Sequence, residues 1–378
     1  MEYWKLVWVF LVALLLYESE GCWENEKAAL LQLKPLFAHI LDVRLDWVDG
    51  NCCEWKRVDC NSSTGRVTRL FLNLTYQYDT QSQAAMDEWH RPWHLNASLF
   101  LSFEELKSLY LSGNSITGFV DNQELNALSN LEKLYMGYNA VNDFVPSQGN
   151  ETEIRLMKLE VLEGYNLQGS IDLRGKLGLH ALKSLEELYL SCGTVCDLPL
   201  QSLDIFPSLK TLSLDSFRFK GTMITQRWQN LTSLEELRLG SSSLTSNIIQ
   251  GIGALASLNK LVISYCEVHV GLNLNGWQKL TSLEELELES SSLPSNLFQL
   301  IGTLTSLKTM LLQYLELNGS LNLQEWQNLT SLKELTVLRS SFPSNFFQDF
   351  GILTSLKYVN VYGCEINGSL NFNGNFSY

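Results

Sequence analysis

The 378-residue sequence predicts an α/β repeat fold. This is a solenoid with a curved parallel β-sheet on its concave face, irregular or 3-10 segments on its convex face, and a helical cap at its amino end. The pattern L-x-x-L-x-L recurs twelve times after residue 66, mostly at intervals of 24 or 25 residues, which is within the about 20 to 29 residues of a leucine-rich repeat. The cap is predicted because four of the eight cysteines, at 22, 52, 53 and 60, surround an apolar helical stretch.

The first 21 residues are expected to be a secretory signal peptide. Leu6 to Leu16 is an unbroken apolar run, and the small residues Ser19 and Gly21 stand three and one positions before Cys22, as at a cleavage site. The run is shorter than the about 20 residues that a membrane-spanning helix needs, and no later apolar run is longer. We therefore expect a mature chain in the secretory pathway, extracellular, or at the outer face of the plasma membrane if a longer anchored form exists.

Export predicts disulfide bonds and N-linked glycans. Outside the cap, Cys192 and Cys196 could bridge locally or remain buried thiols, whereas Cys266 and Cys364 occupy the same repeat position about four coils apart, beyond disulfide reach. There are nine N-x-S/T sequons, more than chance would produce. They lie at Asn61, Asn73, Asn96, Asn150, Asn230, Asn318, Asn328, Asn367 and Asn375.

Composition and motifs exclude several functions. The formal net charge is −14, and no block of Lys and Arg could follow a phosphate backbone, so nucleic acid is not an expected partner. Hydrophobic residues make up 45% of the chain, which excludes intrinsic disorder. No nucleotide-binding, hydrolase, zinc-protease or kinase motif is present, and Pro92 argues against a helical metal site at His90 and His94. We expect no enzyme activity, no cofactor and no metal.

The repeats have a regular register. Trp228, Trp277 and Trp326 are spaced by 49 residues and open similar blocks, so a pair of repeats was the unit duplicated. Each Trp precedes its strand by six residues and is expected to pack inward or on the convex side. The copies begin at Val67, Leu106, Leu131, Leu156, Leu185, Leu209, Leu234, Leu258, Leu283, Leu307, Leu332 and Leu356.

Each copy predicts one short strand. In the repeat that begins at Leu234, the alternation of Leu237 and Leu239 directs these two side chains inward and their neighbours to solvent. One coil cannot bury such a face alone, so stacked coils must close the core. Twelve strands at about 4.8 Å each make a sheet about 55 to 60 Å long, which suits an elongated partner better than a small substrate.

A polar side chain eight residues after each start is expected to satisfy backbone groups inside the solenoid. Asn114, Asn139, Cys266, Cys364, Thr75, Ser242, Ser291 and Ser340 fit this role. Gly164, Gly193, Phe217 and Leu315 do not, so this ladder is interrupted.

Exposed aromatic and charged side chains on the strands are the candidate ligand-binding residues, because Tyr combines a large contact area with a polar tip. Glu284, Glu285, Glu287 and Glu289 share one strand, but their spacing reflects repetition rather than acid–base chemistry. The candidates on the concave face are Tyr110, Tyr135, Tyr189, Arg238, Tyr265, Glu287, Glu289, Tyr314, Arg339 and Tyr362.

Several segments carry a family resemblance. They are C-W-E-N-E-K-A-A-L-L-Q-L-K from Cys22, L-D-W-V-D-G-N-C-C-E-W-K-R-V-D-C through Cys60, and L-N-A-S-L-F-L-S-F-E-E-L-K-S-L-Y-L-S-G-N from Leu95. With them, residues 22 to 378 resemble the extracellular portion of plant leucine-rich-repeat receptor-like proteins. The resemblance implies the disulfides Cys22 to Cys52 and Cys53 to Cys60.

The resemblance also implies the domain organisation: a signal peptide at 1–21, a cap at 22–66, and about twelve repeats at 67–378 with an insertion near 76–95. Members of the family carry more repeats, a carboxy-terminal cap, a transmembrane helix and a short tail. None of these is visible here, so the chain is expected to be a truncated receptor-like protein.

The function expected from these features is non-catalytic recognition of a peptide, glycan or protein ligand in plant cell-surface signalling or defence, with a receptor kinase as a further implied partner. The alternative is a secreted inhibitor of a cell-wall-degrading enzyme, of the polygalacturonase-inhibiting kind, which shares the cap and the repeat subtype.

Overall fold

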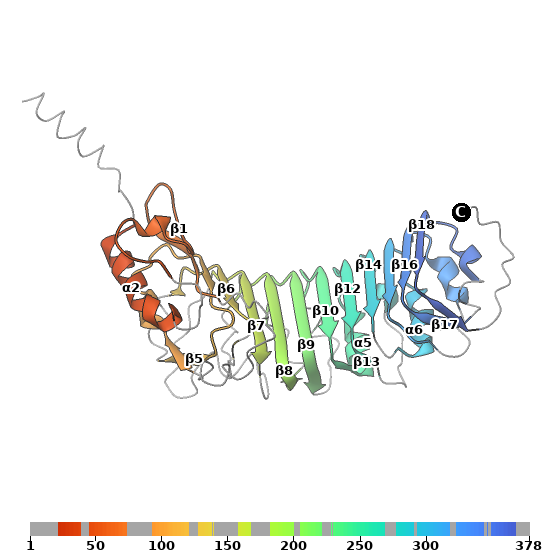
Figure 1. Ribbon diagram of the computed structural model, residues 1–378. Helices are drawn as coiled ribbons and strands as arrows, with labels where there is room; N and C mark the ends of the chain where they lie inside the picture. Colours follow the sequence, from red (N-terminus) through yellow and green to blue (C-terminus); the bar gives the residue numbers. More distant parts are fainter. Residues whose placement is uncertain are drawn as a thin grey trace, which may run out of the picture. The chain divides into compact units, whose positions relative to one another are not determined.

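The structure is a computed structural model (Figure 1). It consists of two compact units, Met1–Leu159 and Glu160–Tyr378, which are described separately. The expected signal peptide and most of the expected insertion lie outside the described residues. Described are residues 22–38, 45–73, 93–120, 128–137, 139, 158–167, 182–199, 205–220, 228, 230–268, 277–290, 293–317, 323–343, 346 and 349–367.

The cap of the first unit is built on helix α2 (Glu24–Ala38). Ala29, Leu30, Leu33 and Phe37 recur at helical spacing and are buried, so one stripe of the helix faces the core. The 3-10 helix η1 (Cys52–Glu54) follows, and the Asn51 side chain accepts hydrogen bonds from the backbone N–H of Cys53 and of Cys22. The cap is thus a folded element and not a linker.

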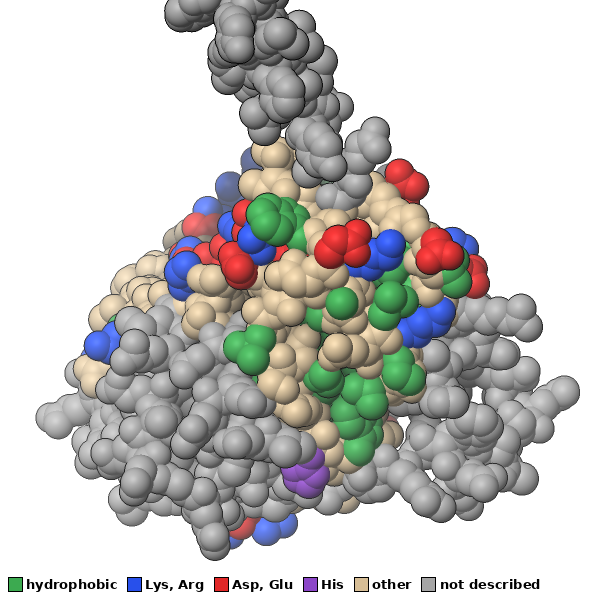
Figure 2. Space-filling view, turned by 90° about the vertical axis from the view of Figure 1, so that its left-hand side faces the viewer, with side chains coloured by type: hydrophobic (Ala, Val, Ile, Leu, Met, Phe, Trp, Pro, Cys, Tyr) green, Lys and Arg blue, Asp and Glu red, His purple; other side chains and the backbone are tan. Residues whose placement is uncertain are grey.

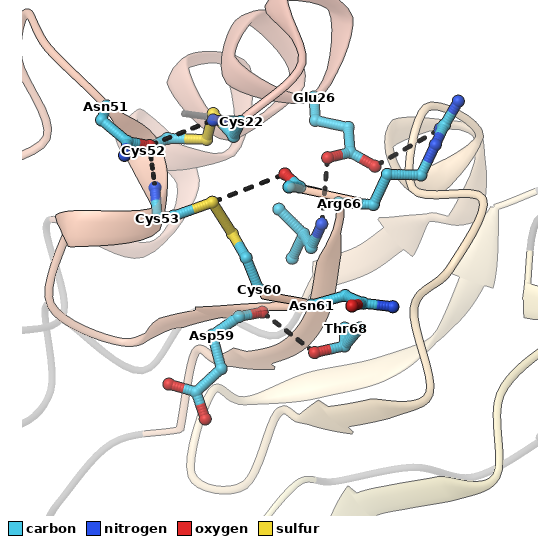
Figure 3. Close-up of a disulfide and its surroundings, with 12 residues drawn as sticks. Cys22, Glu26, Asn51, Cys52, Cys53, Asp59, Cys60, Asn61, Arg66 and Thr68 are labelled. Carbon is cyan, nitrogen blue, oxygen red and sulfur yellow. Dashed lines mark hydrogen bonds and ion pairs between the residues drawn. A yellow bond between two sulfur atoms is a disulfide. The ribbon is translucent and has the colours of Figure 1, made fainter. Parts of the chain in front are cut away.

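Two disulfides hold this cap, and they confirm the pairing that the family resemblance implied. Cys22 bonds to Cys52, and Cys53 bonds to Cys60 at the end of strand β1 (Val58–Cys60). Figure 3 shows both bonds. They tie the start of α2 to η1, and η1 to the first strand.

A buried carboxylate joins α2 to the first repeat. Glu26 is fully buried, and its Oε2 accepts a hydrogen bond from the backbone N–H of Val67 at 3.0 Å (Figure 3). Arg66 lies 3.6 Å from the other carboxylate oxygen, and its guanidinium lies 4.1 Å from the Trp23 ring centre. Burial raises the pKa of Glu26, while the Val67 N–H and Arg66 oppose that shift. The helix is therefore held to the first parallel strand by a polar contact.

The first unit continues as a small parallel sheet. Its strands are β2 (Val67–Phe71), β3 (Trp93–Asn96), β4 (Ser108–Tyr110), β5 (Ile116–Val120) and β6 (Lys133–Met136). The 3-10 helix η3 spans Ala97–Phe100. β1 is antiparallel to β2, after which β2, β4 and β6 follow in parallel register, and β3 pairs with β5 separately.

The second unit is a longer parallel sheet in which the main strands follow in chain order. In Figure 1 these strands stand side by side. They are β7 (Val161–Leu167), β8 (Glu187–Pro199), β9 (Thr211–Lys220), β10 (Glu236–Gly240), β12 (Lys260–Ser264), β14 (Glu285–Glu289), β15 (Thr309–Gln313), β16 (Glu334–Leu338) and β18 (Tyr358–Tyr362). The predicted leucine-rich-repeat fold is confirmed.

Short strands and helices form the return path of the coils where the described residues cover it. Besides the expected 3-10 segments, this part of the chain contains two short α-helices, in which residues such as Ile248 and Ile249 are buried. The helices are α5 (Ser246–Ile252), η7 (Trp277–Lys279), α6 (Ser295–Ile301), η8 (Gln324–Asn328) and η9 (Asp349–Ile352). The short strands are β11 (Ser243–Leu244), β13 (Glu267–Val268), β17 (Ser341–Pro343) and β19 (Glu365–Asn367).

The three repeated tryptophans lie on this helical side, as expected. Trp228, Trp277 and Trp326 are almost fully buried. The indole N–H of Trp277 donates to the carbonyl of Ile249 at 2.9 Å, and that of Trp326 donates to Phe298 at 2.6 Å. Because Ile249 and Phe298 belong to α5 and α6, these two tryptophans pin one coil to the helix of the preceding coil.

The fourth repeat starts three residues later than expected. Val161 pairs with Glu187 and Gly164 with Leu190, which brings Leu159, and not Leu156, into line with Leu185. Leu159 is fully buried, whereas Leu156 lies outside the described residues. Gly164 is therefore an inward strand position and not the turn position. In the segment Leu-Met-Lys-Leu at 156–159, either leucine can be the first residue of the L-x-x-L pattern. The pattern alone therefore could not fix the register.

The polar ladder is present where the described residues cover it. The Ser340 hydroxyl donates to Leu338 at 2.7 Å and accepts from the backbone N–H of Leu315 at 3.0 Å, and Ser242 does the same for Phe217. Apolar side chains at Phe217 and Leu315 are tolerated because the next coil satisfies their backbone. Thr75 and Ser291 lie outside the described residues.

Asparagine and cysteine take the same ladder position elsewhere. Asn139 accepts from the backbone N–H of Asn114 and donates to Leu111. The thiols of Cys266 and Cys364 donate to carbonyls of the preceding coil, Leu239 and Val337, at 3.3 and 3.4 Å. Both cysteines therefore act as ladder residues.

Candidate functional site

The candidate site is the solvent side of the parallel strands, called here the sheet face. Alternation within each strand directs leucines inward and every second residue outward. In β14, Leu286 and Leu288 are fully buried, while Glu285, Glu287 and Glu289 are half-buried on the sheet face. Register pairs Glu287 with Val262 of β12 and with Leu311 of β15. Neighbouring coils thus present their outward residues in rows.

Several strands of the second unit pass into a left-handed backbone conformation at the same repeat position. The residue seven positions after the repeat start has positive φ at Ser216, within β9, and at Ser241 and Ser290, directly after β10 and β14, with values of 64, 44 and 41°. Its N–H donates to the end of the next strand, as Ser241 does to Ser264 at 2.9 Å. This bond between coils holds a conformation that non-glycine residues rarely adopt.

Three large side chains occupy the same turn position, and we call them the exit row: Tyr265, Tyr314 and Arg339, with φ of 53, 52 and 46°. Tyr265 and Tyr314 are 59% and 39% exposed. Bulky residues in this backbone region are strained, and such strain gathers at functional sites. The structure therefore places these three candidates just after their strands, whereas Tyr362 lies within β18 itself.

The exit row is coupled to neighbouring coils. The Arg339 Nη1 donates to the Tyr314 hydroxyl at 2.7 Å, and its guanidinium lies 5.7 Å from the Tyr314 ring centre. The Tyr265 hydroxyl donates to Glu289 at 3.3 Å. These contacts orient the aromatic rings without burying them.

Ion pairs neutralise part of the sheet face between β10 and β14. Lys260 Nζ lies 3.1 Å from Glu285 and 2.5 Å from Glu287, and its hydrogen bond to Glu287 is the main cause that raises the pKa of Lys260. Arg238 pairs with Glu236 of its own strand. The candidates Glu287 and Arg238 are therefore already paired, and Lys260 is a site residue that the sequence analysis did not select.

Tyr189 differs from the exposed tyrosines. Its hydroxyl donates to Glu187 Oε2 at 3.0 Å, and partial burial together with this hydrogen bond raises its pKa to about 12. It stays protonated over the whole physiological range. Tyr189 is thus a fixed hydrogen-bonding group on β8.

The sheet face of the first unit carries a row of stacked rings. Phe71 and Tyr110 have ring centres 4.5 Å apart, and Tyr110 and Tyr135 have centres 4.4 Å apart, with nearly parallel planes. Tyr110 and Tyr135 were predicted, whereas Phe71 was missed. It stands four residues after the repeat start at Val67, as Tyr110 does after Leu106, so the register contained the signal.

An apolar area lies at the cap end of the first unit. Leu31, Leu36 and Val48 are exposed there. Figure 2 shows this end, with hydrophobic side chains in the middle of the view and charged side chains in a band above them. These residues belong to α2 and the segment after it, not to the strands. They therefore do not continue the rows of outward residues on the sheet face.

The sequons differ in their surroundings. Asn230 and Asn328 are exposed. Asn61 is half-buried and donates to Glu105 at 3.0 Å, and the Asn96 side chain caps η3. Asn73 is half-buried and Asn367 ends β19. Asn150, Asn318 and Asn375 lie outside the described residues.

The remaining features add no chemistry to the strands. Cys192 and Cys196 are joined by a disulfide within β8. In the described part of the chain, no three His, Cys, Asp or Glu side chains are grouped as metal ligands. No helix among the described segments is long and apolar enough to cross a membrane.

Comparisons with known proteins agree with the cap and the repeats. Residues 24–61 match the family model described as the leucine rich repeat N-terminal domain. The chain is 28% identical over 246 residues to Cuscuta receptor 1 of Solanum lycopersicum, and 30% identical over 216 residues to Receptor-like protein 9a of Arabidopsis thaliana. These matches cover 54% and 55% of this chain and 21% of each relative. The chain thus spans about a fifth of the length of these relatives.

Solved structures share the fold. The Arabidopsis receptor kinase HAESA in complex with the peptide hormone IDA and the co-receptor SERK1 superposes with a TM-score of 0.55 at 20% identity, over 91% of this chain and 54% of that one. A plant ice-binding protein superposes with a TM-score of 0.50 at 17% identity, over 92% of this chain and 99% of that one. Because proteins as different as a receptor kinase and an ice-binding protein share the fold, the fold alone does not fix the function.

Proposed function

We propose that this chain, a relative of the plant leucine-rich-repeat receptor-like proteins, is a non-catalytic extracellular recognition module. It binds a peptide, glycan or protein ligand on its sheet face. Receptor-like proteins of this kind are generally non-catalytic, and the disulfide-bonded cap is consistent with the secretory pathway. The expected signal peptide at 1–21 supports the same route.

The observation that carries the proposal is the exit row. At the position where three coils of the second unit have Ser and one has Gly363, three further coils hold Tyr265, Tyr314 and Arg339 in strained left-handed backbone. A smaller residue would fold there at lower cost, so the large side chains favour a role outside folding. Tyr and Arg are also the residue types that dominate binding energy at interfaces.

Charge on the sheet face favours a ligand with basic groups. Outward positions from β8 to β16 carry more carboxylates than cations, so a cationic ligand would be attracted to them. The carboxylates are Glu187, Asp197, Asp215, Glu236, Glu285, Glu287, Glu289 and Glu334, and the cations are Arg218, Lys220, Arg238 and Lys260.

The cellular context is proposed from the relatives. The name of Cuscuta receptor 1 indicates a receptor, and the HAESA structure contains a peptide hormone and a co-receptor. We infer for this chain a role in plant cell-surface signalling or defence, with a receptor kinase as a second partner. The domain boundaries 22–66 and 67–378, glycosylation of the nine sequons, and attachment of a longer form to the membrane belong to the same proposal.

A binding screen tests the proposal. The mature chain from residue 22 is secreted from plant cells, immobilised, and probed with a library of synthetic secreted-type peptides and soluble cell-wall oligosaccharides. For any bound probe, Tyr265→Ala, Tyr314→Ala, Arg339→Ala, Glu287→Lys and Glu289→Lys are each expected to weaken binding at least about tenfold, or about 1.4 kcal/mol.

Exposed residues of the helical side provide the matched controls. Gln327→Ala and Thr305→Ala should leave the affinity unchanged, because both residues are exposed and lie outside the strands. Equal losses from the controls would refute the sheet face as the binding surface. Inhibition of a polygalacturonase by the secreted chain would favour the alternative, an enzyme inhibitor, over a receptor.

A further inference from the structure

A groove lies across three successive coils of the second unit, at the turns that precede β10, β12 and β14. Its volume is about 500 Å³, within the range of pockets that hold small ligands. Leu231 and Thr232 line it from the first of these coils, and Lys279 lines it from the third. The lining residues of the middle coil, called here the floor, are Gly253, Ala254, Ala256 and Ser257. Most of its lining is therefore apolar.

The floor consists of small residues. The 49-residue duplication aligns Ala254 with Thr303 and Ala256 with Thr305 in the next pair of repeats. Each Ala lacks the branched hydroxyl-bearing side chain of its counterpart. The hollow is thus a feature of this coil and not of the repeat in general.

Two lining residues of the groove are part of a sequon. Leu231 and Thr232 are the second and third residues of Asn230-Leu231-Thr232, and the Asn230 side chain is exposed. On the far side, Lys279 occupies the place that Asn230 has one pair of repeats earlier, so the sequon is absent there. The groove is therefore adjacent to an attachment point at one side only.

We propose that the groove seats the first sugars of an N-linked glycan carried by Asn230. The inference rests on the extracellular route of the proposed function, because N-linked glycans are added in that route. The C–H faces of the sugars pack on the half-buried Ala254 and the exposed Ala256 and remove apolar surface from water. Sugar hydroxyls bond to the polar rim formed by Thr232 and Lys279.

Asn328 provides an internal control. It stands at the same place in its repeat, 98 residues after Asn230, and is also exposed. The coil after its sequon contains Ile352 and Thr354 in place of the two alanines. A glycan on Asn328 therefore has the same local attachment without the same small-residue floor.

The test compares the two glycans on the whole secreted chain carrying uniform high-mannose glycans. Site-resolved mass spectrometry follows the release of each glycan from the native protein by an endoglycosidase. We expect release from Asn230 to be several-fold slower than from Asn328, and equally fast after denaturation. Filling the floor with Ala254→Thr and Ala256→Thr, singly and together, should abolish the difference while the sequon remains intact.

The outcomes separate this inference from the proposed function. Equal release rates in the native protein, or slow release that survives both Thr substitutions, would overturn the seat. So would an unmodified Asn230 beside a modified Asn328. These results leave ligand recognition on the sheet face untouched, whereas a secreted chain with no glycan at any sequon would also count against the extracellular route.

Discussion

Ser340 illustrates how single side chains hold the coils together. Its hydroxyl is buried and joins the carbonyl of Leu338 to the N–H of Leu315 in the preceding coil. The repeat period predicts such a position from sequence, because the turn must leave each strand at the same point. The same period could not predict that the Leu315 backbone would be satisfied from the next coil, since that bond depends on stacking.

Replacing Ser340 tests the ladder. Ser340→Ala leaves the buried N–H of Leu315 without a partner and is expected to lower the free energy of unfolding by about 1 to 3 kcal/mol. Ser340→Cys should cost less, because the Cys266 thiol takes the same ladder position, donating to the Ser264 carbonyl two residues earlier and bonding to the backbone of Ser242 in the preceding coil. Burial raises the pKa of Cys266 to about 11, which keeps that thiol protonated as a donor. Denaturant midpoints of the two variants check this, and equal losses would contradict it.

The backbone conformation of the exit row could not be predicted from the sequence. Tyr265, Tyr314 and Arg339 could be selected as exposed residues, but not as left-handed ones. Their conformation depends on hydrogen bonds to the next coil, such as that from the N–H of Tyr314 to the carbonyl of Leu338 at 3.0 Å. Such bonds between coils are not encoded in local propensity.

Helices α5 and α6 are whole elements that the sequence did not predict. The leucine alternation predicted the strands, because each strand buries alternate residues. The helical side was expected to be irregular, yet Ser246–Ile252 and Ser295–Ile301 form α-helices. Seven-residue helices are too short to be stable alone, so packing against Trp277 and Trp326 decides their formation.

Gly302, which follows α6, tests how closely these elements pack. A Cβ at Gly302 would lie 2.5 Å from the Cβ and 2.6 Å from the backbone carbonyl carbon of Glu325 in η8. Gly302→Ala is therefore expected to destabilise the chain by about 1 to 3 kcal/mol through overpacking.

Gly351 is the matched control, since it occupies the same place 49 residues later. A Cβ there meets no atom within 4 Å, so Gly351→Ala should change stability by less than about 0.5 kcal/mol. Thermal denaturation of both variants provides the comparison. A Gly302→Ala protein as stable as Gly351→Ala would show that the α6 to η8 contact is looser than the structure indicates.

For the whole molecule, sequence reasoning was strongest where the repeat imposes one geometry on many copies. The parallel sheet and the inward tryptophans were predicted from the repeat, and the cap disulfides were predicted from the family resemblance. It was weakest at Leu156, where two leucines three residues apart satisfied the same pattern, and at Phe71 and Lys260. Phe71 could have been found from its place in the repeat, whereas Lys260 matters only through its ion pairs with the adjacent coil, which require tertiary contact.

The net charge of −14 has a functional consequence at the same scale, because carboxylates predominate on the sheet face of the second unit. A ligand steered by these charges should bind more weakly as ionic strength rises, since screening shortens their range. The ion pairs of Lys260 reduce this field locally at Glu285 and Glu287. The exit row adds an aromatic contact surface beside these carboxylates.

Residue-level footprinting of the secreted chain, with and without a probe identified in the binding screen, tests the central claim most directly. Carboxyl and tyrosine labelling read out Glu287, Glu289, Tyr265 and Tyr314 on the sheet face, and Glu325 on the helical side. The account predicts that bound probe protects the first four and leaves Glu325 unchanged. Protection confined to Glu325, with the tyrosines and carboxylates of the sheet face still labelled, would contradict it.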